Sequence, residues 1–226
     1  MLDDLLIPGV ESLQATPAWS TGTLHLRLLE VAAAGALAAL LLVLFWLQLR
    51  PDFRVAIGQP FFWIKALYTV ALAAIALVAA TAAARPGAAL WPACLTGVAV
   101  LGAMVLSAAL EAPGLGRAMM AHIFDPTGAR NCLTYVVILA APMLLVAGLG
   151  LRRVELERPG LTGLFVGLFC GSVSASIYGG HCQDSTYLFV VLWFSLGVAL
   201  CGVIGAVGLK LIHTSAQTDP LLADPA

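Results

Sequence analysis

The sequence predicts an all-α, polytopic membrane protein, folded as a bundle of six transmembrane helices. Three observations support this prediction. Six uncharged runs each approach or exceed the roughly 20 residues that cross a hydrocarbon core of about 30 Å. Only 10% of the residues are charged, whereas 61% are hydrophobic. The runs lack the alternating pattern of a membrane β-barrel, so their backbone groups must find partners within helices. The runs are residues 31–49, 66–84, 87–110, 131–151, 159–180 and 185–209.

Proline and aromatic residues mark the ends of the first helices. The first run stops at Arg-Pro-Asp, residues 50–52, because proline cannot continue a helix. The second helix starts after Pro60 with three aromatic residues, 61–63, which are typical of the membrane interface. Lys65 lies one turn further in, and we expect it to extend its ammonium group to the headgroups, with Glu111 as the alternative partner.

Small residues predict that the last two helices pack closely. They recur at every fourth position, which allows two helix backbones to approach each other. In residues 159–180 they are Gly163, Gly167, Gly171, Ala175 and Gly179, and in residues 185–209 they are Gly197, Cys201 and Gly205. We interpret both stripes as packing surfaces and not as a ligand site.

The runs divide the chain into an N-terminal segment, 1–26, a transmembrane domain, 27–213, and a tail, 214–226, that is predicted to be disordered. An even number of spans places both termini on one side of the membrane. Six Arg and Lys residues fall on that side and five on the other, so charge alone does not decide the orientation. A formal net charge of −1 gives no electrostatic footprint for direct binding to nucleic acid.

Potential metal ligands and thiols gather on the side opposite the termini. Two thiols and two imidazoles suit Zn or Cu(I), and thioether sulfur favours Cu(I). Alternatively, two thiols that approach closely can form a disulfide. Asp184 either orients His181 or faces water. Cys94, Cys170 and Cys201 lie within apolar runs and are predicted to pack as small hydrophobic residues. The gathered residues are Met119, Met120, His122, Asp125, Cys132, His181, Cys182 and Asp184.

No catalytic signature is present in the sequence, so we expect a sensor or regulator and not an enzyme. One alternative is a membrane thiol-disulfide oxidoreductase that uses Cys132 and Cys182 with a quinone. Another is a metal transporter, although transporters need polar groups near the midplane and these helix centres have almost none.

Several ordered motifs resemble the NrsF family of membrane anti-sigma factors. The resemblance extends from about residue 27 to residue 212. The motifs are Arg50-Pro51-Asp52, Pro60-Phe61-Phe62-Trp63-x-Lys65, Ala84-Arg85-Pro86-Gly87, Asn131-Cys132-Leu133 with Pro142, Pro159-x-x-Thr162-Gly163, and Tyr178-x-x-His181-Cys182-x-Asp184 followed by Phe189 and Trp193.

The resemblance implies a multi-pass protein of the bacterial inner membrane with both termini cytoplasmic. Such a protein sequesters an extracytoplasmic-function sigma factor and releases it under metal or oxidant stress. Cys132 and Cys182 match the family's sensing thiols and would lie on the periplasmic side. No cofactor is obligatory. A transient Cu or Zn ion, bound by these thiols with His181, Met119, Met120 or His122, or a Cys132–Cys182 disulfide, would carry the signal.

The N-terminal segment is a candidate contact for the sigma factor. Its apolar residues alternate with carboxylates, which suit an apolar groove on a partner with a basic surface. The alternative is a disordered or membrane-skimming terminus. The candidate contact residues are Leu2, Asp3, Asp4, Leu5, Leu6 and Glu11.

Overall fold

Proline places the start of most long helices. It occupies the first or second position of α3, α4, α6 and α7, where its fixed φ suits the helix and its missing N–H has no helical partner to lose. The computed structural model describes residues 21–48, 50–85, 87–152, 154 and 156–218, and its regular elements are all helical. The predicted contact residues in segment 1–20 lie outside the described residues.

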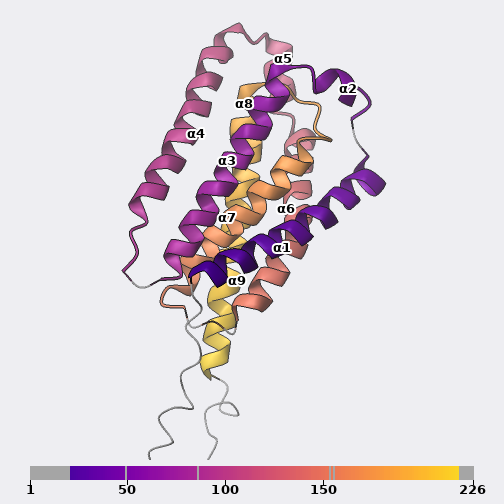
Figure 1. The fold of residues 1–226 in the computed structure, drawn as a ribbon. Coiled ribbons are helices and arrows are strands. Elements are labelled where there is room, and N and C mark those ends of the chain that lie inside the picture. The colour runs from indigo at the N-terminus through magenta and orange to yellow at the C-terminus, as the bar shows by residue number, and fades with distance from the viewer. Residues whose placement is uncertain (1–20, 49, 86, 153, 155, 219–226) are drawn as a thin grey trace, which may run out of the picture.

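The elements follow in chain order (Figure 1). The first half contains α1 (Thr21–Leu42), the π-helix η1 (Val43–Leu47), α2 (Phe53–Ala56), α3 (Pro60–Ala83), α4 (Trp91–Glu111) and the 3₁₀ turn η2 (Ala112–Gly114). The second half contains α5 (Arg117–Ile123), α6 (Pro126–Leu151), α7 (Pro159–Tyr178), α8 (Tyr187–Phe189), the π-helix η3 (Val190–Phe194) and α9 (Ser195–Thr218).

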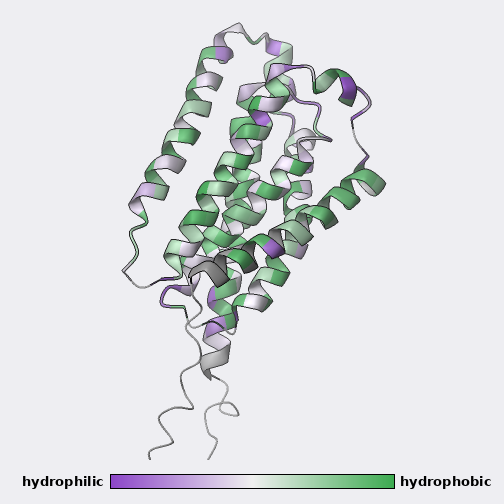
Figure 2. Cartoon of the chain, in the orientation of Figure 1, coloured by the Kyte–Doolittle hydropathy of each residue, from purple (hydrophilic) through white to green (hydrophobic). Residues whose placement is uncertain are grey.

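Five helical stretches in the described residues are long and apolar enough to cross a membrane. They correspond to the second to sixth predicted spans, which confirms an all-α chain with several apolar spans. The first predicted span differs, because only Ala33–Phe45 forms an apolar helix there, shorter than the other five. Helix α1 begins at Thr21, so its first turns include Arg27 and Glu30. In Figure 2, hydrophobic residues cover most of the long helices and hydrophilic residues gather mainly at the two ends.

Helix α7 forms the centre of the bundle and α4 its edge. Helix α7 packs against α3, α6 and α9, and 56% of the residues in its 18-residue apolar stretch are buried. Helix α4 packs mainly along α3, and only 11% of the residues in its 18-residue apolar stretch are buried. Helix α1 lies obliquely across α6 and α7 (Figure 1). The fold therefore has a tight α3–α6–α7–α9 core with α1 and α4 on its outside.

Close contact between α7 and α9 confirms the predicted packing of the last two helices. A Cβ atom on Gly163 would collide with the carbonyl oxygen of Gly205, and one on Gly167 with that of Cys201. The prediction was wrong for Gly197, which faces Val136 of α6 at 3.2 Å from its ideal Cβ position. The stripe on α9 therefore serves two neighbouring helices.

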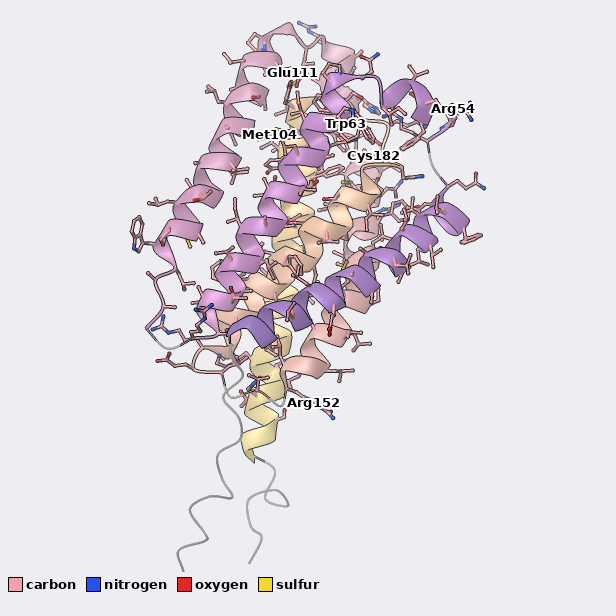
Figure 3. All side chains as sticks on the ribbon, in the orientation of Figure 1. Arg54, Trp63, Met104, Glu111, Arg152 and Cys182 are labelled. Carbon is pink, nitrogen blue, oxygen red and sulfur yellow. The ribbon has the colours of Figure 1, made fainter. Side chains whose placement is uncertain are left out.

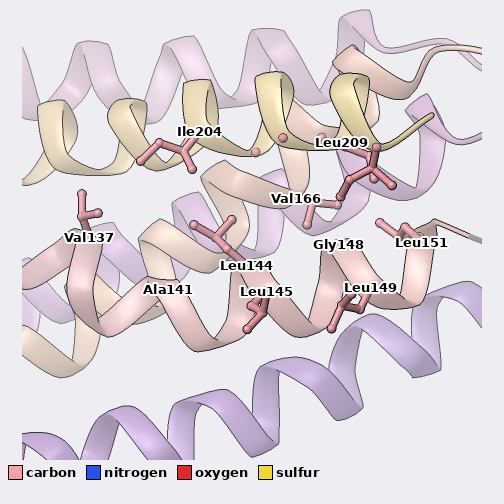
Figure 4. Close-up of a pocket in the computed structure, with 14 residues that line it drawn as sticks. Val137, Ala141, Leu144, Leu145, Gly148, Leu149, Leu151, Val166, Ile204 and Leu209 are labelled. Atoms are coloured by element: carbon pink, nitrogen blue, oxygen red, sulfur yellow. The ribbon is translucent and has the colours of Figure 1, made fainter. Parts of the chain in front are cut away.

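The bundle has two distinct ends. The loop that follows α7 and carries Cys182 lies at the upper end in Figure 3, whereas Arg152 and the end of α9 lie at the lower end. Helix α9 continues to Thr218, beyond residue 213, where we predicted the transmembrane domain to end. An apolar cavity of about 300 Å³ separates the lower parts of α6 and α9 (Figure 4). It is lined by residues such as Ala141, Gly148, Val166, Ile204 and Leu209.

Candidate functional site

The loop between α7 and α8 presents His181, Cys182 and Asp184. It begins as a tight turn, because the amides of His181 and Cys182 both donate to the carbonyl oxygen of Tyr178, at 2.9 and 3.0 Å. Thr186 closes the loop as the cap of α8, accepting from the amide of Phe189 at 3.4 Å. The loop is therefore anchored at both ends by the helices it connects.

Lys65 anchors the middle of this loop from α3. Its Nζ donates to the carbonyl oxygens of Cys182 and Asp184 at 3.1 and 3.2 Å and lies 5.6 Å from the ring centroid of Phe194. The side chain is only 2% exposed. Our prediction that Lys65 extends to the headgroups, or pairs with Glu111, was wrong. Lys65 donates to the loop carbonyls and not to Glu111. Glu111 instead accepts from the amide of Leu188 at 3.2 Å.

Asp184 joins the loop to α5. One carboxylate oxygen lies 2.9 Å from Nε2 of His122, and the other lies 3.7 Å from the Cys182 sulfur, which donates to it. We had weighed two roles for Asp184, orienting His181 or facing water. The structure shows neither, since the carboxylate contacts His122 and the thiol. The Asp184 carboxylate thus connects two candidate metal ligands, His122 and Cys182.

Both candidate sensing thiols lie at the upper end of the bundle. Cys132, on α6, is fully buried, and Cys182 is 4% exposed. Both are free thiols. They lie close enough to each other and to Lys65 for charges on the three groups to interact. Burial raises the pKa of the Cys182 thiol to about 11, although the Lys65 charge opposes this shift. At neutral pH Cys182 is therefore protonated and a poor nucleophile in this conformation.

His181 is held by two tyrosine rings and one carbonyl. Its Nδ1 lies 2.7 Å from the carbonyl oxygen of Gln48. Its ring centroid lies 5.8 Å from that of Tyr178 and 6.1 Å from that of Tyr135. A carbonyl only accepts, so Nδ1 carries a proton, and Nε2 is the nitrogen that could offer a lone pair to a metal ion. A backbone carbonyl often fixes the tautomer of metal-binding histidines in this way.

A cavity of about 430 Å³ with a mixed polar and apolar lining lies beside the loop and borders Cys182. Its lining includes His181, Cys182 and Asp184 from the loop, with Asn131 and Tyr135 from the helix that carries Cys132. The cavity therefore lies between the two elements that bear the thiols.

The other candidate ligands are less closely gathered. Met119, Met120 and His122 lie on the short helix α5, where Met119 is 43% exposed. Asp125 caps α6, because its carboxylate accepts from the amide of Gly128 at 3.0 Å. In the described part of the chain, no three His, Cys, Asp or Glu side chains are arranged to hold a metal ion. Metal binding here would require the candidate ligands to move closer together.

Sequence reasoning missed the structural roles of Lys65 and Gln48. The signal for Lys65 was available, because Lys65 lies inside α3 and an ionisable residue within a membrane span almost always faces the bundle interior and a partner. Gln48 carried no such signal, since its contribution is a backbone carbonyl.

Residues 14–212 match the family described as negative regulator of sigma F, or NrsF. The chain belongs to the NrsF family. It is 40% identical over 182 residues to the anti-sigma-F factor NrsF of Caulobacter vibrioides, covering 79% of this chain and 84% of that protein. It is 31% identical over 174 residues to the probable anti-sigma-F factor NrsF of Azospira oryzae, covering 76% of this chain and 80% of that protein. No solved structure matches the chain.

Replacing Lys65 by Met should speed alkylation of Cys182 by about tenfold or more in a chain that keeps Cys182 as its only cysteine. The buried carbonyl of Cys182 and the partly buried carbonyl of Asp184 would lose their donor, at a cost of up to roughly 1–3 kcal/mol each, so the loop should open. Burial is the main cause of the raised pKa of Cys182, so opening should lower that pKa toward its ordinary value near 9. Reaction with a maleimide, followed by mass spectrometry, measures the rate.

The same substitution at Lys210, which is exposed on α9, is the matched control and should leave the rate unchanged. The charge of Lys65 also favours the thiolate, so its loss alone would slow the reaction. A slower reaction in the Lys65→Met chain would therefore contradict an anchoring role.

Proposed function

We propose that this member of the NrsF family is a membrane anti-sigma factor whose thiols control release of its partner. It sequesters an extracytoplasmic-function sigma factor and releases it on metal or oxidant stress. The observation that carries the proposal is the position of Cys132 and Cys182, which are distant in sequence yet lie at the same end of the bundle. The family description and the names of both relatives support the anti-sigma role.

The proposed topology has six spans in a bacterial inner membrane, with α1 completing the set and both termini in the cytoplasm. The five long apolar stretches support the membrane location. The Cys182 loop would then face the periplasm, a compartment that permits both disulfides and metal capture. The N-terminal segment would face the sigma factor.

The proposed signal is the binding of one metal ion by side chains from both α6 and the Cys182 loop. A Zn or Cu ion bound by Cys132, Cys182 and Nε2 of His181 would draw α6 toward the loop. Moving a two-state equilibrium from 1:99 to 99:1 requires about 5.5 kcal/mol, and structural zinc sites in peptides provide roughly 10–16 kcal/mol. The cavity between α6 and α9 supports such a shift, because it leaves space between these two helices.

A disulfide would have the same mechanical effect. Both thiols would lose a proton and together pass two electrons to an oxidant, and the new S–S bond would join α6 to the loop. Because the family members named here are regulators, we propose no catalytic turnover for these thiols.

Deleting residues 1–26 should abolish co-purification of the sigma factor with the membrane-embedded chain. The segment carries Asp3, Asp4 and Glu11, whose charges complement a basic partner surface. Affinity purification from cells that express both proteins measures the retained partner. Deleting residues 219–226 instead is the control and should leave binding unchanged. Full retention of the sigma factor by the chain that lacks residues 1–26 would refute the N-terminal contact.

A further inference from the structure

Two hydrogen bonds connect the Cys182 loop to the segment that follows the first helix. Nδ1 of His181 donates to the carbonyl oxygen of Gln48 at 2.7 Å, and the amide of Arg50 donates to the carbonyl oxygen of Gly180 at 3.4 Å. On the loop the contacts come from the adjacent residues Gly180 and His181, and on the other side from the backbone of Gln48 and Arg50, so only the His181 ring contributes a side chain. The two hydrogen bonds therefore connect the loop to the residues that directly follow η1.

We call the two hydrogen bonds between the Cys182 loop and residues 48–50 the joint. The backbone of Gln48 has an unusual conformation at this joint. Its φ of 65° and ψ of 153° are rare for a residue with a side chain, and it is the only non-glycine residue with positive φ in the described ranges. Such a conformation is strained and persists only where the surroundings enforce it. The hydrogen bond from His181 to the Gln48 carbonyl is one such constraint.

Helix α1 and η1 follow each other without a break and pack against the bundle through one face. This buried face carries small or short side chains at every fourth position, namely Gly35, Ala39 and Val43. The opposite face is exposed, with Leu37 at 59% and Phe45 at 82% exposure. A Cβ atom on Gly35 would collide with the side chain of Met143 on α6, so the small residues on this face let the first helix pack closely against α6. The π-helix η1 at its end adds a segment whose hydrogen bonding already departs from the α-helical pattern.

The His181 ring itself is fixed. It contacts the rings of Tyr178 at the end of α7 and Tyr135 on α6, one turn after Cys132. The ring therefore moves with the two elements that bear the sensing thiols, while its Nδ1 contacts the first helix segment.

We propose that His181 is a positioning residue that couples the Cys182 loop to α1, so that displacement of the loop shifts the helix leading to the N-terminal segment. This inference rests on the proposed function only for the stimulus that moves the loop. Nε2 makes no hydrogen bond to the residues that the structure describes, and the coupling runs through Nδ1 whether or not a metal binds.

Hydrogen–deuterium exchange of the purified full-length chain in nanodiscs tests the joint without a sigma factor or a metal. His181→Phe keeps an aromatic ring but loses the donor, whereas His181→Asn places an amide N–H near the position of Nδ1. We expect exchange of the amides of residues 42–50 to rise about fivefold or more in His181→Phe and to stay near wild type in His181→Asn, as loss of one hydrogen bond predicts. Exchange equal to wild type in His181→Phe would overturn the joint.

A second measurement tests transmission along α1. In chains that keep Cys182 as their only cysteine, N-ethylmaleimide adds a bulky group to the loop. We expect alkylation to change exchange in residues 21–42 of the parent and His181→Asn chains, but not of His181→Phe. A response that persists in His181→Phe would refute the coupling. Exchange of α9 reports folding, and His181→Leu replaces His181→Phe if that variant does not fold.

These measurements separate the inference from the proposed function. A chain that shows the joint but no response to Zn²⁺ or Cu⁺ refutes thiol sensing and leaves the coupling intact. A chain that binds metal through its thiols but shows no change in α1 refutes the coupling alone.

Discussion

Cells in which serine replaces both Cys132 and Cys182 should keep expression of the sigma factor's target genes at the uninduced level after metal is added. Serine preserves the size of each side chain but removes the soft thiolate that a Zn or Cu ion requires. Each single substitution should have nearly the same effect, because a bridge needs both sulfur atoms. A reporter fused to a target promoter measures induction over a range of metal concentrations.

Cys94→Ser is the matched control, since Cys94 lies on α4 and is exposed, away from the loop. It should respond to metal as the wild type does. Co-purification of the sigma factor with the double serine variant shows that the variant still folds and binds its partner. Normal induction in that variant would exclude Cys132 and Cys182 as the sensing groups.

Gly205→Ala should lower the melting temperature by several degrees, whereas Gly208→Ala on the same helix should not. An added methyl group on Gly205 would collide with the carbonyl oxygen of Gly163, but one on Gly208 would meet no atom within 4 Å. Overpacking of this kind costs about 1–3 kcal/mol, and each kcal/mol corresponds to about 2–4 °C for a chain of this size. Alanine at Gly208 should instead gain up to about 1 kcal/mol from helix propensity.

Thermal unfolding in detergent, followed with a dye that reacts with newly exposed thiols, measures both variants, because Cys132, Cys170, Cys182 and Cys201 are buried in the folded chain. Equal melting temperatures for the two variants would show that close contact between α7 and α9 does not limit stability.

Most of the helical architecture was accessible from the sequence because lipid imposes a strong constraint on each span. The uncharged runs and the proline residues located five long helices, although α9 continues nine residues beyond residue 209, where the last run ends. The glycine stripe on α7 also predicted its partner. The first helix was less accessible, because α1 begins at Thr21, among charged residues that hydropathy assigns to water. Gly197 could not be assigned, since spacing identifies a packing face but not which neighbour occupies it.

The candidate site was only partly accessible from the sequence. Residue types and their common side of the membrane located Cys132, Cys182 and His181 at one end of the bundle. They did not predict that Asp184 contacts His122 and Cys182, or that Lys65 holds the loop from α3. Both contacts depend on how helices distant in sequence align in three dimensions. The contact between His181 and Gln48 involves a backbone carbonyl, which no residue pattern reveals.

The peripheral position of α4 has an evolutionary consequence. Most of its surface has no protein neighbour, with Leu95, Val98 and Leu106 each more than half exposed. Lipid tails accept any apolar side chain, so selection at these positions acts on overall hydrophobicity and not on shape. Substitutions among family members should therefore accumulate fastest in α4, while its final residue, Glu111, is retained for its contact with the backbone of α8.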